Sequence, residues 1–312
     1  MSGFDPAQLE VLRELEARGS VTEVAAALHR SPSAVSQQLR TLQRQVGVPL
    51  VERHGRGVRL TDAGHALAAS SLRIAAAMAE AEATWQEFRG GASGTVRVAF
   101  FPSAAELLVP GLLTRFAAHP AIEVHIEDHD LSQEGFAGLA DDVDIVVAHR
   151  SDDSDRAPAL TVVPLLREPL DVALPPTHPL AGAASVRMDE VIDDDWVGVP
   201  RDYPLDRVLQ SMAVQTGRPA RLVYRTIHLP LVENLVAAGH GIALMPRHTS
   251  LDRARGRFRL VPIADVRAGR HIEALMRPDR AARLAVRTII DDLRAEAAAI
   301  GTVAPERHVT KR

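Results

Sequence analysis

Hydrophobic residues recur every three or four positions through the N-terminal part of the chain, which is the spacing of amphipathic helices. A first helix is predicted from Pro6 to Arg18, and a short second helix begins after Ser20, a favourable N-cap. A third helix has the clearest signals, because Ser31 is a good N-cap and Pro32 suits the first helical position. The apolar positions of these helices are, in order, Leu9, Leu12 and Leu15; Val21, Val24, Ala25 and Leu28; and Val35, Leu39, Leu42 and Val46.

The opposite face of the third helix is polar and cationic, and comprises Ser33, Gln37, Arg40 and Arg44, with Ser36 beside them. Two short helices joined by a tight turn, the second with such an outer face, form the helix-turn-helix arrangement that places its second helix in the DNA major groove. Glutamine pairs with adenine, serine donates or accepts, arginine binds guanine or phosphate, and helix N-terminal amides favour phosphate. The third helix is therefore predicted to read DNA.

A small hairpin is predicted from Leu50 to Leu60, because Gly55 and Gly57 allow a tight turn between two short extended segments. Beside a recognition helix such a hairpin would be a wing. Arg53 or Arg56 could enter the minor groove, where a narrow A·T tract attracts arginine.

Charge along the chain supports this prediction. Residues 27–60 contain six arginines and a single acid, Glu52, whereas the whole chain has a formal net charge of −4. A local positive excess within an acidic protein is typical of a surface that binds a polyanion. The alternative is an ordinary pair of surface helices whose arginines are solvated.

A long helix is predicted from an N-cap at Thr61 to Phe88, since this stretch has no proline and Gly64 as its one glycine. Its inner positions alternate by four and three over three heptads: Leu67, Ser71, Ile74, Met78, Ala81, Trp85 and Phe88. Heptad spacing predicts pairing with a second helix. The alternative is packing against the helix's own domain, and Ser71 and Ala81 weaken the seam.

Residues 90–94 are rich in glycine and predict a hinge. Beyond them strands and helices alternate, which predicts an α/β domain with parallel strands. Strands are expected at residues 95–101, 122–127, 144–148, 160–166, 170–174, 196–199, 222–225, 242–245, 258–262 and 271–276. Helices are expected at residues 104–119, 133–140, 204–215, 229–238 and 280–299, and residues 301–312 form a polar, basic tail that we expect to be disordered.

Several ordered stretches match a known family: Gly19-Ser20-Val21, Ala25-Ala26-Ala27-Leu28, Ser31 to Leu39, Leu42, Gly47-Val48-Pro49-Leu50, Arg53 and Leu60 to Gly64. Together they resemble the LysR-type transcriptional regulators. Residues 174–181 and 235–246 resemble the effector-binding half of the same family. Two positions depart from the pattern, Gln43 in place of the usual glutamate and Val51 in place of the usual phenylalanine, and both concern local packing more than DNA binding.

The resemblance implies an α/β fold class with an N-terminal winged helix-turn-helix, a long linker helix and a two-lobed effector domain similar to the periplasmic binding proteins. The implied domains are 1–60 for DNA binding, 61–89 for the linker and dimerisation helix, 90–94 for the hinge and 95–300 for effector binding. Lobe one would comprise 95–165 and 268–300, and lobe two 166–267. The resemblance also implies pairing through the linker helix, giving a homodimer or homotetramer.

Ligands in open α/β sheets bind beyond the carboxyl ends of the strands. Candidates for a small-molecule effector, polar or anionic, are Ser103, Ala104, His149, Tyr203 and His228. Ser103 and His228 precede helices whose amides could hold an anion. The alternatives are that both only cap helices and that Tyr203 only packs.

Other chemistry has little support in the sequence. The chain contains no cysteine, which excludes disulfides and thiolate chemistry within it. His125 and His129 would lie about 13 Å apart on a strand, too far to chelate one metal ion. We find no nucleophile elbow, phosphate-binding loop or dinucleotide motif, so no catalytic residue, metal or cofactor is predicted. A membrane span and a signal peptide are also not predicted, and we expect a cytoplasmic protein.

The leading hypothesis is therefore a sequence-specific transcriptional regulator controlled by a small molecule, and not an enzyme. It would bind double-stranded DNA through Ser31, Pro32, Ser33, Ser36, Gln37, Gln38, Arg40, Arg53 and Arg56, with RNA polymerase as a further candidate partner. Two alternatives stay open at this point, a cytoplasmic solute-binding protein and an α/β enzyme with a nucleic-acid-binding appendage.

Overall fold

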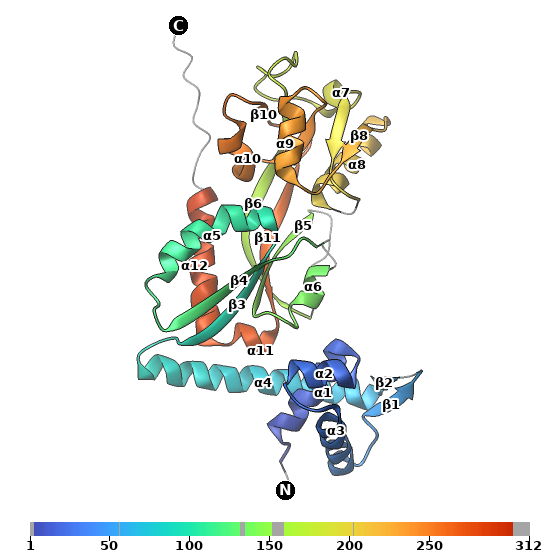
Figure 1. The fold of residues 1–312 in the computed structure, drawn as a ribbon, viewed down its shortest axis with the longest axis vertical. Helices are drawn as coiled ribbons and strands as arrows, with labels where there is room; N and C mark the ends of the chain where they lie inside the picture. The colour runs from blue at the N-terminus through green and yellow to red at the C-terminus, as the bar shows by residue number, and fades with distance from the viewer. Residues whose placement is uncertain (1–2, 56, 132–134, 152–158, 202, 302–312) are drawn as a thin grey trace. The chain divides into compact units, whose positions relative to one another are not determined.

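The computed structural model describes residues 3–55, 57–131, 135–151, 159–201 and 203–301 (Figure 1). The chain divides into two compact units, residues 1–93 with 277–287, and residues 94–276 with 288–312. Arg56, one of the predicted DNA-binding residues, lies outside the described residues.

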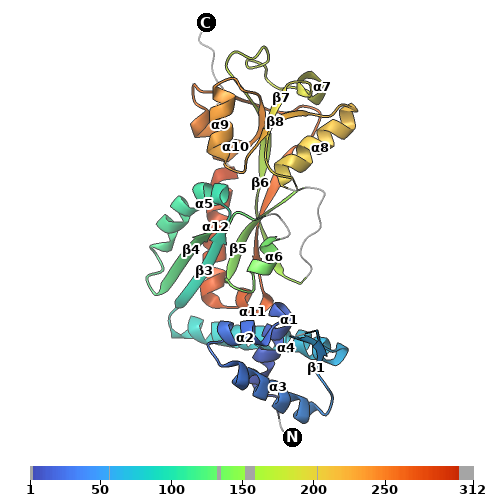
Figure 2. The same ribbon diagram turned by 45° about the vertical axis from the view of Figure 1, so that its right-hand side comes forward.

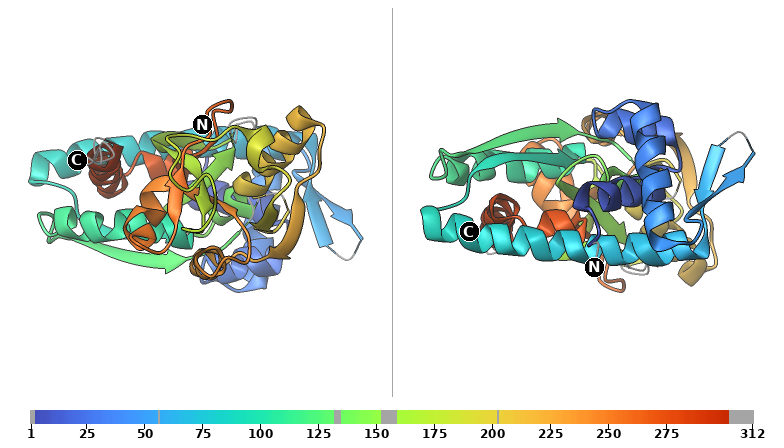
Figure 3. Two further views of the ribbon diagram at one scale, coloured as in Figure 1. Left: turned by 90° about the horizontal axis from the view of Figure 1, so that it is seen from above. Right: turned by 90° about the horizontal axis from the view of Figure 1, so that it is seen from below.

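The first unit is mainly helical. Its elements are α1 (Pro6–Arg18), α2 (Val21–Ala27), α3 (Pro32–Val46), β1 (Val51–His54), β2 (Gly57–Leu60), α4 (Asp62–Arg89) and α11 (Pro278–Ala281). Strands β1 and β2 pair antiparallel, and Figure 3 shows this hairpin projecting beyond the helices of the unit. Within the same unit, Arg277 donates to Oε1 of the buried Glu14 at 2.8 Å.

Capping residues mark the ends of the first four helices. Oxygen atoms of Asp5, Ser20, Ser31 and Thr61 accept hydrogen bonds from the first turns of α1, α2, α3 and α4. Glycines in the left-handed conformation end α1, α3 and α4 at Gly19, Gly47 and Gly90. Local sequence therefore determines where these helices begin and end.

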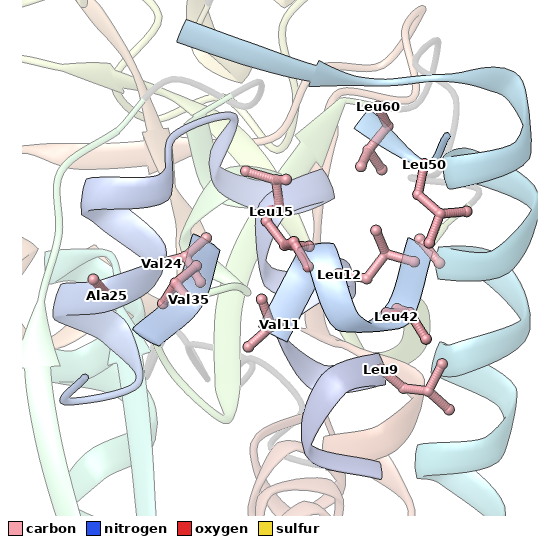
Figure 4. Packing of buried hydrophobic residues seen from close by; sticks show 12 residues of the cluster. Leu9, Val11, Leu12, Leu15, Val24, Ala25, Val35, Leu42, Leu50 and Leu60 are labelled. Atoms are coloured by element: carbon pink, nitrogen blue, oxygen red, sulfur yellow. The ribbon is translucent and has the colours of Figure 1, made fainter. Parts of the chain in front are cut away.

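The apolar faces of the first three helices, the hairpin and the start of α4 close one small core (Figure 4). Leu12 and Leu15 of α1 lie at its centre, against Leu42 of α3 and Leu50 and Leu60 at the ends of the hairpin segment. Gly64 is required here, because a Cβ at this position would lie 2.2 Å from the carbonyl oxygen of Leu50.

The second unit has two lobes. The first contains β3 (Gly94–Phe100), α5 (Pro102–Phe116), β4 (Ile122–Asp128), α6 (Gly135–Leu139), β5 (Ile145–Ser151) and the C-terminal part of α12 (Leu284–Gly301). The second contains α7 (Met188–Val191), β7 (Asp195–Gly198), α8 (Pro204–Thr216), β8 (Arg221–Arg225), α9 (Leu229–Ala237), β9 (Ala243–Pro246), α10 (Arg247–Ala254) and β10 (Arg259–Val261).

Two long strands, β6 (Thr161–Leu174) and β11 (Gly269–Met276), pair antiparallel and run from one lobe to the other (Figures 1 and 2). In the first lobe β3 pairs parallel with β4 and β5, and β11 joins β5 antiparallel. In the second, β9 and β10 pair antiparallel with β6, while β7 and β8 are parallel. The expected parallel arrangement thus holds for β3, β4, β5, β7 and β8 only.

The structure differs from the prediction in three ways. The strands expected at 160–166 and 170–174 are one strand, β6, within which Glu168 is buried and paired with Arg270 across the sheet. The helix expected at 280–299 is divided into α11 and α12. The short α7 and the polar α10 were not predicted, since neither has a long apolar stripe.

Candidate DNA-binding surface and ligand cavity

The outer face of α3 is exposed along its whole length. Ser33, Gln37, Arg40 and Arg44 lie on it, while Val35, Leu39 and Leu42 are buried on the opposite side. Arg53 is exposed on β1 in the neighbouring hairpin. Among the described residues, none of these three arginines has an acidic partner within ion-pair distance. This exposed cationic stripe is the arrangement that the charge pattern predicted.

Some predicted DNA-binding residues have structural partners instead. Ser31 Oγ accepts from the backbone N–H of Ala34 and contacts Ser33 Oγ at 2.9 Å. Gln38 is half-buried, and its Oε1 accepts from Arg30 at 2.8 Å. Ser36 is also half-buried, whereas Pro32 is exposed at the start of α3. Ser31 and Gln38 therefore hold α3 in place.

Two of the six arginines counted from the sequence are already paired. Arg30 lies 3.3 Å from Glu10 of α1, and Arg59 lies 2.6 Å from Glu52 across the hairpin. The sequence count consequently overstates the charge offered to DNA.

Gln43 joins α3 to the hairpin segment. Its Oε1 accepts from the backbone N–H groups of Leu50 and Val51, at 2.8 and 3.1 Å. The side-chain amide of Gln43 also keeps two N–H donors. A groove then runs along the outer side of α3 toward the hairpin, lined by Gln37, Arg40, Gln43, Arg44, Gly47, Val48, Pro49 and Val51.

The heptad positions of α4 are buried at the start of the helix and exposed farther along it. Leu67 packs against the small core and Ser71 is buried, with its hydroxyl donating to Leu9 O at 3.0 Å. Farther along, Ile74, Met78, Trp85 and Phe88 are exposed, and the rings of Trp85 and Phe88 stack 5.5 Å apart. The first third of the seam thus packs against its own unit, and the rest is an uncovered apolar stripe.

The second unit contains a cavity of about 200 Å³ between its lobes. The side chains come from the ends of α5, α8 and α9 and from the strands that join the lobes. The lining residues are Phe101, Pro102, Ser103, Glu106, Asp130, His149, Val199, Tyr203, Pro204, Leu205, Ile227, His228, Leu229, Pro230 and Arg270. Four predicted effector residues, Ser103, His149, Tyr203 and His228, therefore meet in one place, while the buried Ala104 is not in the lining.

A buried charged network forms the floor of this cavity. Arg270 of β11 donates to Glu168 of β6 at 2.6 Å and to Ser103 Oγ at 3.1 Å. The other carboxylate oxygen of Glu168 accepts from both the backbone and the hydroxyl of Thr249, at 2.8 and 2.9 Å. The guanidinium also lies 5.1 Å from the ring centre of Phe101. Full pairing is what allows such charges to be buried.

His149 lies among aromatic rings: the centre of its imidazole is 5.0 Å from the ring centres of Phe101 and Phe136, and 5.8 Å from that of Tyr203. Burial, reinforced by the positive charge of Arg270, lowers the pKa of His149 to about 3, so the imidazole is neutral at physiological pH. Burial and the nearby Asp130 carboxylate raise the pKa of Tyr203, which keeps its hydroxyl protonated.

Sequence reasoning did not select Arg270, Asp130 or Phe101. Strand β6 contains Arg167, Glu168 and Asp171, and β11 contains Arg270 and Glu273, so the local pattern does not single out Glu168 and Arg270 as a pair. Asp130 and Phe101 carry no local signal either.

Among the described residues, no group of histidine, aspartate and glutamate side chains is arranged to hold a metal ion. No described helix is both long enough and apolar enough to cross a bilayer.

Comparison with known proteins decides the family. The family model of the LysR substrate binding domain matches residues 89–298, and that of the bacterial regulatory helix-turn-helix protein, lysR family, matches residues 6–65. The chain belongs to the LysR family. It is thus a transcriptional regulator with a DNA-binding and an effector-binding domain, and not an enzyme.

Known relatives of this LysR-family regulator align with most of its length. It is 24% identical to a probable RuBisCO transcriptional regulator of Synechocystis sp., over 88% of this chain and 81% of that protein. Full-length OxyR from Pseudomonas aeruginosa, in a variant form, has a TM-score of 0.68 at 19% identity, covering 94% of this chain and 96% of the other. Full-length CbnR, solved with its target DNA, has a TM-score of 0.53 at 20% identity, covering 94% and 100%.

Proposed function

We propose that this regulator binds its operator through the outer face of α3, with Ser33, Ser36 and Gln37 at base edges and Arg40, Arg44, Arg53 and Arg56 at phosphates or the minor groove. The exposed Ser/Gln/Arg stripe carries the proposal, because its residue types match the donors and acceptors of the major groove. Ser31, Pro32 and Gln38 contribute by fixing the start and the orientation of the helix. We also propose residues 1–60 as the DNA-binding domain, and the cytoplasm, where the chromosome lies, as the place of action.

A second copy of the chain is the proposed partner of α4. The exposed stripe of Ile74, Met78, Trp85 and Phe88 repeats at heptad spacing, and a helix with the same repeat is the partner that such spacing fits. A groove of about 370 Å³ between α1 and α4, which includes Ile74 and Met78, extends this apolar surface. Pairing through α4 would present two copies of α3 to two half-sites, as a homodimer or within a homotetramer.

The cavity between the lobes is the proposed effector site. Its walls come from both lobes, so a ligand that binds there has a different affinity for different lobe arrangements. The chain has no cysteine, and control by thiol oxidation is therefore unavailable to it. A reversibly bound small molecule is the signal that the cavity supports.

The test combines selection of bound genomic fragments, at near-physiological salt, with light scattering of matched variants. Met78→Glu places a charge on the exposed seam, whereas Ala77→Glu places the same charge on an exposed position beside it. Wild type and Ala77→Glu should form dimers or tetramers and enrich the same fragments. Met78→Glu should lose assembly and enrichment together. A Met78→Glu protein that assembles and binds DNA like wild type would show that another surface joins the copies.

A further inference from the structure

Three helices begin at the cavity without a side chain to cap them. The N-cap residues of α5, α8 and α9 are Phe101, Tyr203 and His228, and within the described residues none makes a side-chain hydrogen bond to its helix. Each helix also has a proline in its first two positions. Proline removes one N–H from each first turn, and the N–H groups of Ala104 and Leu231 already donate to the N-cap carbonyls of α5 and α9. The N–H of Ser103 in α5 has no backbone acceptor within the described residues, and the positive helix ends favour a carboxylate.

A second observation indicates a hydrogen-bond donor on the ligand, in addition to a carboxylate. The imidazole of His149 is 5% exposed, and within the described structure its Nδ1 has no hydrogen-bond partner. A neutral imidazole has one donor nitrogen and one acceptor nitrogen, so Nδ1 accepts from a ligand donor when the ring proton is on Nε2.

Asp130 adds a negative charge on the same side. It lines the cavity, has no ion-pair partner among the described residues, and acts electrostatically on Tyr203. Arg270, which also lines the cavity, is paired with Glu168, although its charge still contributes to lowering the pKa of His149. The faces of the Phe101 and Tyr203 rings also favour a cation over an anion. This part of the cavity therefore suits a positively charged hydrogen-bond donor.

We propose that the effector is a small zwitterion, an amino acid or close relative, with its carboxylate at the start of α5 and α9 and its ammonium group facing Asp130, His149 and Tyr203. This inference rests on the proposed use of the cavity as the effector site. At about 200 Å³ the cavity would hold roughly seven waters at liquid density, which limits the ligand to the size of a small metabolite. The proposal replaces the broader expectation of a polar or anionic effector.

The experiment is calorimetric titration of the full-length protein with matched probes. L-alanine, L-valine, L-leucine and L-phenylalanine are compared with their primary amides, which lack the carboxylate, and with the corresponding 2-hydroxy acids, which lack the ammonium group. At least one amino acid should bind about tenfold or more tightly than both of its analogues, since each analogue leaves one buried end without its charged partner. A 2-hydroxy acid that binds as tightly as its amino acid, or amino acids that all fail to bind at millimolar concentration, would overturn the proposal.

Matched variants locate the ammonium group. Asp130→Asn should reduce the preference for amino acid over hydroxy acid about tenfold. Glu123→Gln removes a carboxylate from an exposed position of β4 outside the cavity and should leave that preference unchanged. Equal behaviour of the two variants would remove Asp130 from the site.

DNA binding separates this proposal from the one on which it rests. If an amino acid binds the cavity but changes neither operator affinity nor the DNA footprint, the proposed ligand class is supported and the proposed control through this site is overturned. If operator binding responds only to 2-hydroxy acids or other anions, control through the cavity is supported and the zwitterionic ligand is overturned.

Discussion

The four N-terminal helices of this regulator and the three helices that begin at the cavity start in opposite ways. Asp5, Ser20, Ser31 and Thr61 cap α1, α2, α3 and α4 with their own side chains. The three helices at the cavity start at Phe101, Tyr203 and His228, which within the described residues provide no such bond. Uncapped helix ends lose stability that a cap would supply, typically about 1 kcal/mol each.

The difference indicates what each unit is built to do. The DNA-binding unit has side-chain caps at the starts of α1 to α4 and presents side chains on the outer face of α3. The cavity presents the N–H of Ser103 and Nδ1 of the buried His149, neither of which has a hydrogen-bond acceptor or donor within the described residues. Groups of this kind are satisfied when a ligand binds, so ligand binding and lobe stability are coupled there.

Removing the positive charge of Arg270 should have the largest effect on the free energy of unfolding. Arg270→Ala leaves Glu168, which is fully buried, without its cation, and we expect a loss of about 3–5 kcal/mol in the unfolding free energy of the second unit. Urea unfolding monitored by fluorescence of the buried Trp196, with Trp85 replaced by phenylalanine, measures it. Arg255→Ala, which breaks an exposed ion pair with Asp252, should cost under about 0.5 kcal/mol. Equal losses for the two variants would show that the buried network does not support the lobes.

On the DNA-binding side, the informative change is at an exposed side chain. Gln37→Ala should weaken specific operator binding by about 1–3 kcal/mol, because a bidentate contact to a base is lost, and should leave the fold intact. Gel-shift titrations with the selected operator and with a scrambled duplex of equal length measure both affinities. Parallel weakening on both duplexes would mean that Gln37 contacts phosphate rather than a base.

The sequence predicted the DNA-binding unit closely because its signals are local. The caps at Ser31 and Thr61 and the α3 stripe each lie within a few residues of the helix that they define. The cavity was predicted only in part, since it joins residues far apart in the chain. The strands expected at 160–166 and 170–174 form one strand, in which Glu168 pairs with Arg270, 102 positions away. No local pattern contains this information.

The buried imidazole predicts a pH dependence confined to the second unit. The folded-state pKa of His149 is lowered from 6.5 to about 3, so between these values the unfolded chain binds a proton that the folded chain does not. The stability that the neutral His149 contributes is therefore fully present above the unfolded pKa of 6.5, and it decreases as the pH falls toward 3. From pH 7 to pH 5 the expected loss is about 2 kcal/mol.

Urea unfolding at several pH values, with His149→Phe as the comparison, isolates this contribution. Phenylalanine fits the aromatic surroundings and does not titrate, so the variant should lose less stability over the same interval. Identical pH slopes for the two proteins would exclude His149 as the titrating group.

Removing a cap from the first unit should have a smaller effect. Ser31→Ala deletes the acceptor for the Ala34 N–H at the start of α3 and should destabilise that unit by about 1 kcal/mol. Ser31→Asp retains a capping oxygen and should restore stability, while its negative charge near the DNA weakens operator binding. Thermal unfolding and gel shifts on the two variants separate the role of Ser31 in folding from a contact with DNA. If Ser31→Ala loses DNA affinity without any loss of stability, the serine is a DNA ligand first.

Adding a cap to the cavity is the smallest change and the most direct test of the comparison. His228→Asp gives α9 the carboxylate acceptor that it lacks, and should stabilise the second unit by about 0.5–1 kcal/mol. The same carboxylate would place a negative charge at the helix start to which we assign the ligand carboxylate, so amino-acid binding should weaken by more than tenfold. His240→Asp, at a position outside the cavity lining and beyond the end of α9, is the matched control and should do neither. A gain in stability together with unchanged ligand affinity would mean that the open end of α9 is only an uncapped helix and that the carboxylate binds elsewhere.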